Sequence, residues 1–137
     1  MLTITLIVLL LLGNLIYWGS RKEGFHIDEM FSYEQVGNTK YPRLHHNRPD
    51  EPYLNNWHDR SYYEDYLTIN TDSVFDIVGF YQSARKNGAH PPLYLTTLGM
   101  AISAISPNHF TKWSGIALNI FLYIISLVKV SKVTCYM

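Results

Sequence analysis

The chain has 137 residues, of which 47% are hydrophobic, and its formal net charge is zero because eleven Lys and Arg residues balance eleven Asp and Glu residues. A neutral chain is not expected to bind nucleic acid through a basic surface. Its single cysteine excludes a disulfide within the chain and a cysteine-based zinc cage.

The charged residues are segregated along the chain. All eleven acidic residues lie between Glu23 and Asp76, no charged residue precedes Arg21, and none lies between Lys86 and Lys112. This order of apolar, polar and apolar blocks predicts an α-helical membrane protein. We expect two transmembrane helices that flank an outer loop with juxtamembrane helices, in a multi-pass arrangement in the cell membrane.

Residues 1–18 are expected to form the first transmembrane helix. The uncharged run from Leu2 to Trp18 is near the lower length limit for crossing a hydrocarbon core of ~30 Å. Tyr17 and Trp18 are typical of the aromatic belt at a membrane interface. The run has no basic residue before it and no good cleavage site after it, so we expect an uncleaved anchor rather than a signal peptide.

Residues 19–90 are expected to form an extracytoplasmic loop that contains an amphipathic helix over residues 73–87. Ser73 and Asp76 predict a capping box at its start, and Asn87-Gly88 is a stop signal. Its apolar stripe would either lie along the membrane interface or pack against the loop, and the sequence leaves both open. The stripe comprises Val74, Ile77, Val78, Tyr81 and Ala84.

Residues 91–106 are expected to form a juxtamembrane or re-entrant helix, because Pro91-Pro92 favours a helix start and the uncharged run is short. Small or polar residues recur along one face of this helix and predict close contact with another helix. They are Thr96, Gly99, Ser103 and Ser106.

Residues 110–130 are expected to form the second transmembrane helix, followed by a cytoplasmic tail over residues 131–137. Lys129 and Lys132 indicate the cytoplasmic side by the positive-inside rule, although Arg21 and Lys22 oppose this orientation. If only the first and last segments cross the membrane, both termini lie in the cytoplasm and the polar block lies outside.

Two adjacent carboxylates, Asp28 and Glu29, follow the first apolar segment at a distance of a few residues. Carboxylates close to a bilayer are costly to desolvate, so they need solvent, a cation or a reaction. The functional interpretation is an active-site carboxylate on the outer face of the membrane. The structural alternative is the first turn of a helix, where acidic residues are favoured.

Three features follow one another along the chain: a first span that ends shortly before His26-x-Asp28-Glu29, an outer loop, and His90-Pro91-Pro92-Leu93-Tyr94. In this order they resemble the N-terminal part of the GT-C superfamily of membrane glycosyltransferases. The chain looks most like the family 39-like enzymes related to protein O-mannosyltransferases and aminoarabinose transferases. Members of that family are several times longer, so the resemblance implies a truncated GT-C fold.

The resemblance implies that a sugar moves from a polyprenyl-phosphate donor, which lies among the membrane lipids, to an extracytoplasmic acceptor. The acceptor is a glycan, a lipid or a protein. It also implies that the chain is inactive alone and needs the missing C-terminal spans as partners. No nucleic acid takes part. No cofactor is implied beyond a divalent cation, Mg²⁺ or Mn²⁺.

The resemblance further assigns site residues. Asp28 matches the catalytic carboxylate, as general base or as a metal ligand, and Glu29 completes the catalytic pair. His26 and His90 belong to the two motifs and would bind substrate. Lys112 would bind the lipid phosphate, at a place where relatives often carry an arginine. Many relatives also have an acidic residue just before His-Pro-Pro, whereas this chain has Gly and Ala there.

The main rival hypothesis is a small non-enzymatic membrane protein that binds a larger membrane partner. Thr96, Gly99 and Ser103 would then form its contact face. The histidines of the polar block lack the helical spacing of a metal site and are expected to be solvated loop residues.

Overall fold

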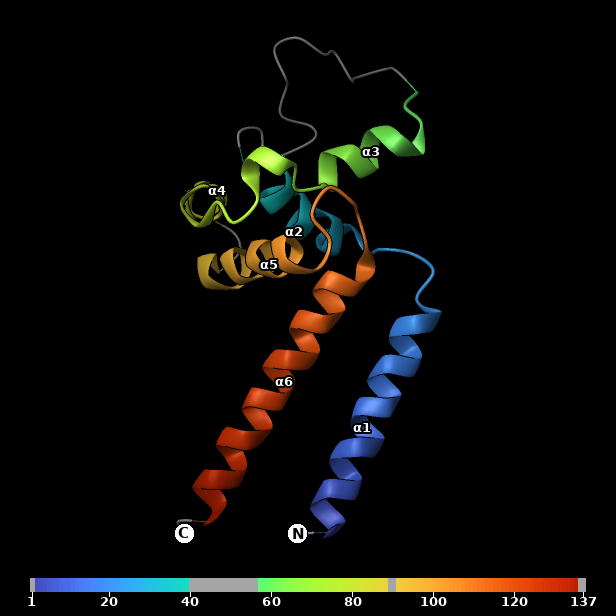
Figure 1. Cartoon of the computed structure of the whole chain (residues 1–137), viewed down its shortest axis with the longest axis vertical. Helices are drawn as coiled ribbons and strands as arrows, with labels where there is room; N and C mark the ends of the chain where they lie inside the picture. The colour runs from blue at the N-terminus through green and yellow to red at the C-terminus, as the bar shows by residue number, and fades with distance from the viewer. Residues whose placement is uncertain (1, 40–56, 89–90, 136–137) are drawn as a thin grey trace.

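The computed structural model describes residues 2–39, 57–88 and 91–135, and every regular element within these ranges is a helix. This confirms the α-helical class. Helices α2 to α5 gather into a cluster, and α1 and α6 extend from it so that their free ends lie on the same side (Figure 1). The elements are α1 (Leu2–Arg21), α2 (Ile27–Gly37), α3 (Arg60–Leu67), η1 (Thr71–Ser73), α4 (Ile77–Asn87), α5 (Pro92–Ile105) and α6 (Lys112–Cys135).

Helix α6 contains the one stretch of the described residues that is long and apolar enough to cross a membrane, Lys112–Val130. The apolar part of α1, Thr5–Arg21, is shorter, as is α5. The structure therefore supports one candidate span where the sequence predicted two.

Helix α2 begins at the acidic pair. The extended residue His26 is its N-cap, and Nδ1 of His26 accepts a hydrogen bond from the backbone N–H of Asp28 at 3.3 Å. In return, Oε2 of Glu29 accepts one from the backbone N–H of His26 at 2.8 Å. Such a reciprocal cap satisfies N–H groups that the helix itself leaves without a partner. Asp28 and Glu29 therefore lie in a first helical turn, as the structural alternative predicted.

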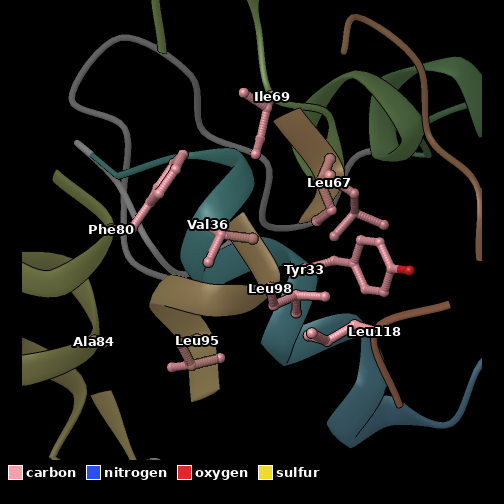
Figure 2. Packing of buried hydrophobic residues seen from close by; sticks show 10 residues of the cluster. Tyr33, Val36, Leu67, Ile69, Phe80, Ala84, Leu95, Leu98 and Leu118 are labelled. Carbon is pink, nitrogen blue, oxygen red and sulfur yellow. The ribbon is translucent and has the colours of Figure 1, made fainter. Parts of the chain in front are cut away.

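The buried core lies where α2, α4 and α5 meet, and it reaches the start of α6 (Figure 2). Gly37 allows α2 to touch the end of α3, because a Cβ atom at this position would lie 2.7 Å from the backbone of Leu67. Burial of these apolar side chains is what holds the four short helices together, since each is too short to be stable alone. The core residues are Tyr33, Val36, Leu67, Ile69, Phe80, Ala84, Leu95, Leu98, Ile102 and Leu118.

Helix α4 starts at Ile77, four residues later than the sequence predicted. Its N-cap is Asp76, whose Oδ1 accepts a hydrogen bond from the N–H of Gly79 at 2.9 Å, whereas Ser73 ends the separate turn η1. Gly88 has a φ of 66° directly after the helix, which confirms the predicted stop signal.

The predicted apolar stripe of α4 packs inward only in part. Ala84 is buried, but the rest of the inward face is formed by Phe80 and Ser83, which the stripe did not include. Phe80 buries a large ring, and the hydroxyl of Ser83 donates a hydrogen bond to the backbone oxygen of Gln35 in α2 at 2.8 Å. Three residues of the predicted stripe are instead exposed to about half or more: Ile77, Val78 and Tyr81.

The small-residue face of α5 does make a close helix–helix contact, as predicted. A Cβ atom on Gly99 would lie 2.6 Å from the ring of Phe80 in α4. Ser103 is also buried on this face, and Ser106 shares a 2.7 Å hydrogen bond with Ser114 of α6. The contact is therefore made within the chain.

Candidate functional site

A cavity of about 250 Å³ lies between the α1–α2 connection, α2, α5 and the start of α6. It brings together three of the predicted site residues, Asp28, Glu29 and Lys112, although Lys112 is more than eighty residues away along the chain. Other polar groups on its wall come from Lys22, Ser32, Tyr94 and Asn119. Two cations and two carboxylates therefore share one small, half-open space.

Glu29 forms an ion pair with Lys22 in this cavity. The distance from Nζ of Lys22 to Oε2 of Glu29 is 2.7 Å, and the same oxygen accepts the N–H of His26. Burial tends to raise the pKa of Glu29, but the hydrogen bonds from Lys22 and from the His26 backbone, together with the nearby positive charge, hold this pKa below its ordinary value. Glu29 is therefore a carboxylate with two partners.

Asp28 is much more open than its neighbour, since its side chain is 73% exposed. Oδ2 of Asp28 lies 3.3 Å from Nδ1 of His26. Because that nitrogen also accepts the backbone N–H of Asp28, and because His26 is absent from the cavity wall, the observed role of His26 is to cap the helix. Asp28 is thus the carboxylate that a second molecule can reach.

Lys112 caps the end of α1. Its ammonium group donates hydrogen bonds to the backbone oxygens of Ser20, at 3.0 Å, and of Lys22. A cation is favoured at the C-terminal end of a helix, where carbonyl groups lack intrahelical partners. The ammonium of Lys112 therefore lies at the cavity but is already engaged with α1.

Tyr33 fixes the carboxylate helix above the start of α6. Its hydroxyl group donates a hydrogen bond to the backbone oxygen of Thr111 at 3.0 Å. Burial raises the pKa of Tyr33 to about 12, in spite of a hydrogen bond from Gly115 that acts in the opposite direction. The neutral phenol is therefore the form that the fold stabilises.

A second hollow, of about 730 Å³, runs between α1 and α6. It is mainly apolar, with side chains such as Leu11, Leu15 and Ile120 on its walls. The two helices approach closely at its upper end, where a Cβ atom on Gly19 would lie 3.3 Å from Ile116. We call this hollow the α1–α6 groove. It adjoins the cavity, because three residues line both spaces: Lys22, Ile116 and Asn119.

Sequence reasoning missed part of this site. Lys22 was considered only as evidence on orientation, although it directly follows the first apolar segment. Asn14 and Asn119, which line the groove, are lone amides within apolar helices. Polar residues at such positions usually mark a contact or a functional site, so this signal was present in the sequence.

Two predicted assignments find no support in the described residues. His90 lies outside the described ranges. Within those ranges, no three His, Cys, Asp or Glu side chains come together as a metal-binding group. Mg²⁺ is usually held by one or two carboxylates and by substrate phosphates, and here Glu29 is engaged with Lys22. The described donors therefore do not form a protein-only cation site, and Asp28 as a metal ligand stays a prediction.

The comparisons with known proteins add no assignment, because no protein-family model, no curated protein and no solved structure matches this chain.

Proposed function

We propose that the chain is the N-terminal part of an integral membrane glycosyltransferase, which moves a sugar from a polyprenyl-phosphate donor to an extracytoplasmic acceptor. One observation carries the proposal: an exposed carboxylate, Asp28, shares a small cavity with two lysines at the head of an apolar groove. A lipid-linked sugar phosphate has parts that complement this site: an apolar chain for the groove, an anionic phosphate for the lysines and a polar sugar for the cavity.

In this proposal α1 and α6 both cross the membrane and α5 lies on its outer surface. Most large apolar side chains of α1 and many of α6 are exposed in the isolated chain, which fits contact with lipid. Helix α5 carries no charge and exposes Leu93 to 79% on the side that its core contacts leave free. The free ends of α1 and α6 lie on the same side (Figure 1), as two antiparallel crossings require.

The chemistry follows from the placement of the charges. The donor chain lies in the α1–α6 groove and the sugar lies in the cavity. A hydroxyl group of the acceptor attacks the anomeric carbon while the bond from that carbon to the phosphate oxygen breaks. Asp28 takes the hydroxyl proton, and the phosphate leaves with the bonding electrons beside the lysine cations. The exposure of Asp28 leaves room for the acceptor.

The rival hypothesis, a non-enzymatic protein that binds a membrane partner, is less well supported. Its proposed contact face centres on Gly99 and Ser103, and both are buried within the chain, where Phe80 covers Gly99. That face is therefore not open to a partner.

The proposal is tested by sugar transfer in membranes. The full chain, co-expressed with the C-terminal spans that the proposal requires, is given a radiolabelled polyprenyl-phosphate hexose. We expect Asp28→Asn to lower transfer by about 100-fold or more, as loss of a general base does. The matched control, Asp72→Asn, removes an acidic residue that lines neither hollow and is expected to leave transfer unchanged. Absence of transfer, or equal transfer by both variants, would refute the proposal.

A further inference from the structure

Lys22 occupies a distinctive place between the two hollows. It lines both the cavity and the α1–α6 groove, and it is the one charged residue that does so among the residues that the structure describes. Its side chain is 29% exposed, so its ammonium group is partly withdrawn from solvent. An amphiphile lying in the groove would bring its polar end to this ammonium group.

The other cation of the cavity is less available. Nζ of Lys112 is engaged with two backbone oxygens at the end of α1. To give an anion more than its one remaining N–H group, Lys112 would have to release the α1 terminus. Lys22, by contrast, has one ion-pair partner, Glu29, which is itself an anion, and its ammonium group also lies 5.7 Å from the centre of the Phe25 ring.

The Lys22–Glu29 pair can open without unfolding α2. Oε2 of Glu29 also accepts the backbone N–H of His26 at 2.8 Å, and this bond belongs to the helix cap rather than to Lys22. If an external anion takes the place of Glu29 on Lys22, Glu29 keeps its backbone partner and α2 keeps its cap. The exchange replaces one charge-assisted hydrogen bond by another.

We propose that Glu29 occupies the phosphate position of an anionic lipid on Lys22, and that this lipid binds by displacing it. The occupant is an isoprenoid monophosphate whose chain lies in the α1–α6 groove and whose phosphate pairs with Lys22. The choice of an isoprenoid chain rests on the proposed function. The site itself rests on the ion pair and on the two adjoining hollows.

Displacement has a chemical consequence for Glu29. Lys22 supplies the larger part of the interactions that lower the pKa of Glu29, by a hydrogen bond and by its charge. Once a phosphate holds Lys22, that pKa rises and the carboxylate becomes a stronger base beside Asp28. The second carboxylate of the cavity is thus released only when the lipid is in place.

The test uses the full chain in phosphatidylcholine nanodiscs, labelled with a benzophenone derivative of farnesyl phosphate. We expect Lys22→Ala to reduce labelling about tenfold or more, because the loss of a hydrogen bond to a charged group weakens binding by about this factor. Lys22→Arg is expected to retain labelling within about threefold, because it keeps the charge. The matched control is Arg21→Ala, since Arg21 is the adjacent cation, lies over the ring of Tyr17 and lines neither hollow.

Glu29→Gln is the variant that separates displacement from simple attraction. Gln still accepts the backbone N–H in a capping box, so the helix is retained, but it no longer competes for Lys22. Labelling is expected to increase about threefold or more, by removal of a competing ion pair. Unchanged or weaker labelling in Glu29→Gln, or equal losses in the Lys22→Ala and Arg21→Ala variants, would overturn the inference.

Competitors identify the source of the affinity. Unlabelled farnesyl phosphate is expected to displace the probe, whereas farnesol and inorganic phosphate at equal concentration are not. Displacement by inorganic phosphate would indicate a plain anion site, and displacement by farnesol a site for the chain alone, and either result contradicts the proposal. Because the probe carries no sugar, this experiment and the transfer assay fail independently.

Discussion

The hydroxyl oxygen of Tyr33 accepts a hydrogen bond from the backbone N–H of Gly115 at 2.9 Å. This contact joins two segments more than eighty residues apart, the helix that carries the carboxylates and the first turn of α6. A Cβ atom at Gly115 would lie 2.9 Å from the same oxygen, so the glycine leaves room for the contact. The position of Asp28 relative to α6 therefore depends on Tyr33.

Tyr33→Phe removes this contact and the bond to Thr111. We expect the free energy of unfolding to fall by about 1–2 kcal/mol, as for the loss of one or two buried hydrogen bonds. Urea unfolding in detergent, followed by circular dichroism, measures the change. Tyr81→Phe is the control, because Tyr81 is about half exposed and lies outside the core. Equal stability of the Tyr33→Phe variant and the parent would contradict the role assigned to Tyr33.

The same residue predicts a loss of stability at alkaline pH. The pKa of Tyr33 is raised to about 12 in the folded chain, so folding favours the protonated phenol. Its contribution is fully present below the ordinary pKa of about 10 and is lost as the pH rises through 12. We expect a nuclear magnetic resonance titration of ¹³Cζ-labelled tyrosine to show a late-titrating signal that is absent from Tyr33→Phe.

Gly99 lets α5 pack closely against Phe80 of α4, since a Cβ atom at this position would lie 2.6 Å from the ring. Gly99→Ala places a Cβ atom against the ring, and we expect it to cost about 1–3 kcal/mol, the usual range for overpacking. Gly13→Ala is the matched control, because nothing lies within 4 Å of that position and alanine favours a helix. Adding Phe80→Leu to Gly99→Ala should recover part of the loss. Thermal unfolding distinguishes these variants, and a neutral Gly99→Ala would show that the two helices do not pack so closely.

Lys112 is expected to hold the end of α1 against α6. Lys112→Met removes two hydrogen bonds from the ammonium group, and amide exchange in residues 14–25 should become about tenfold faster, as expected for a loss of ~1–2 kcal/mol. Lys129→Met changes the same residue type lower on α6 and should leave this exchange unchanged. Hydrogen exchange with mass spectrometry gives both values. Similar amide exchange rates in the two variants would show that Lys112 does not cap α1.

Glu29 predicts a loss of stability in acid. Its pKa is lowered in the folded chain, so its contribution is present above the ordinary value of 4.5 and is lost as the pH falls through the lower, folded value. Glu29→Gln should therefore flatten the fall in melting temperature between about pH 5 and 3, a window that begins just above the ordinary pKa of 4.5. Glu23→Gln should behave as the parent chain. A parent-like acid profile in Glu29→Gln would argue against the ion pair.

The apolar helices were the part of the fold that the sequence could predict. Uncharged runs and flanking prolines limit α5 locally, and the observed bounds of α5, Pro92–Ile105, lie within the predicted range 91–106. Helix α6 begins near its predicted start but runs to Cys135, past the predicted end at residue 130, so Lys129 does not end it. Helix α3 was not predicted, because Arg60–Leu67 is short and mostly polar, although Tyr63, Tyr66 and Leu67 lie at helical spacing. The orientation of α4 was missed because it depends on the fit of Phe80 against Gly99, which lies on another helix.

The candidate site was predictable for the residues that form a motif and not for those that only the fold brings near. Asp28 and Glu29 are adjacent in sequence, and their helix-start position follows from local capping. The pairing of Lys22 with Glu29 depends on how the α1–α2 connection turns back, and no spacing rule predicts it. The engagement of Lys112 with α1 likewise arises from the contact of two segments ninety residues apart.

The proposed reaction requires the carboxylate cavity to face the outside of the membrane. Gln82 is exposed on α4, in the helical cluster that carries this cavity, so Gln82→Cys in a Cys135→Ser background reports its side. In intact cells, a membrane-impermeant maleimide is expected to label Gln82→Cys, and to label Lys132→Cys only after permeabilisation. The reverse pattern, with Gln82→Cys labelled only in permeabilised cells, would place Asp28 in the cytosol and contradict the proposed reaction.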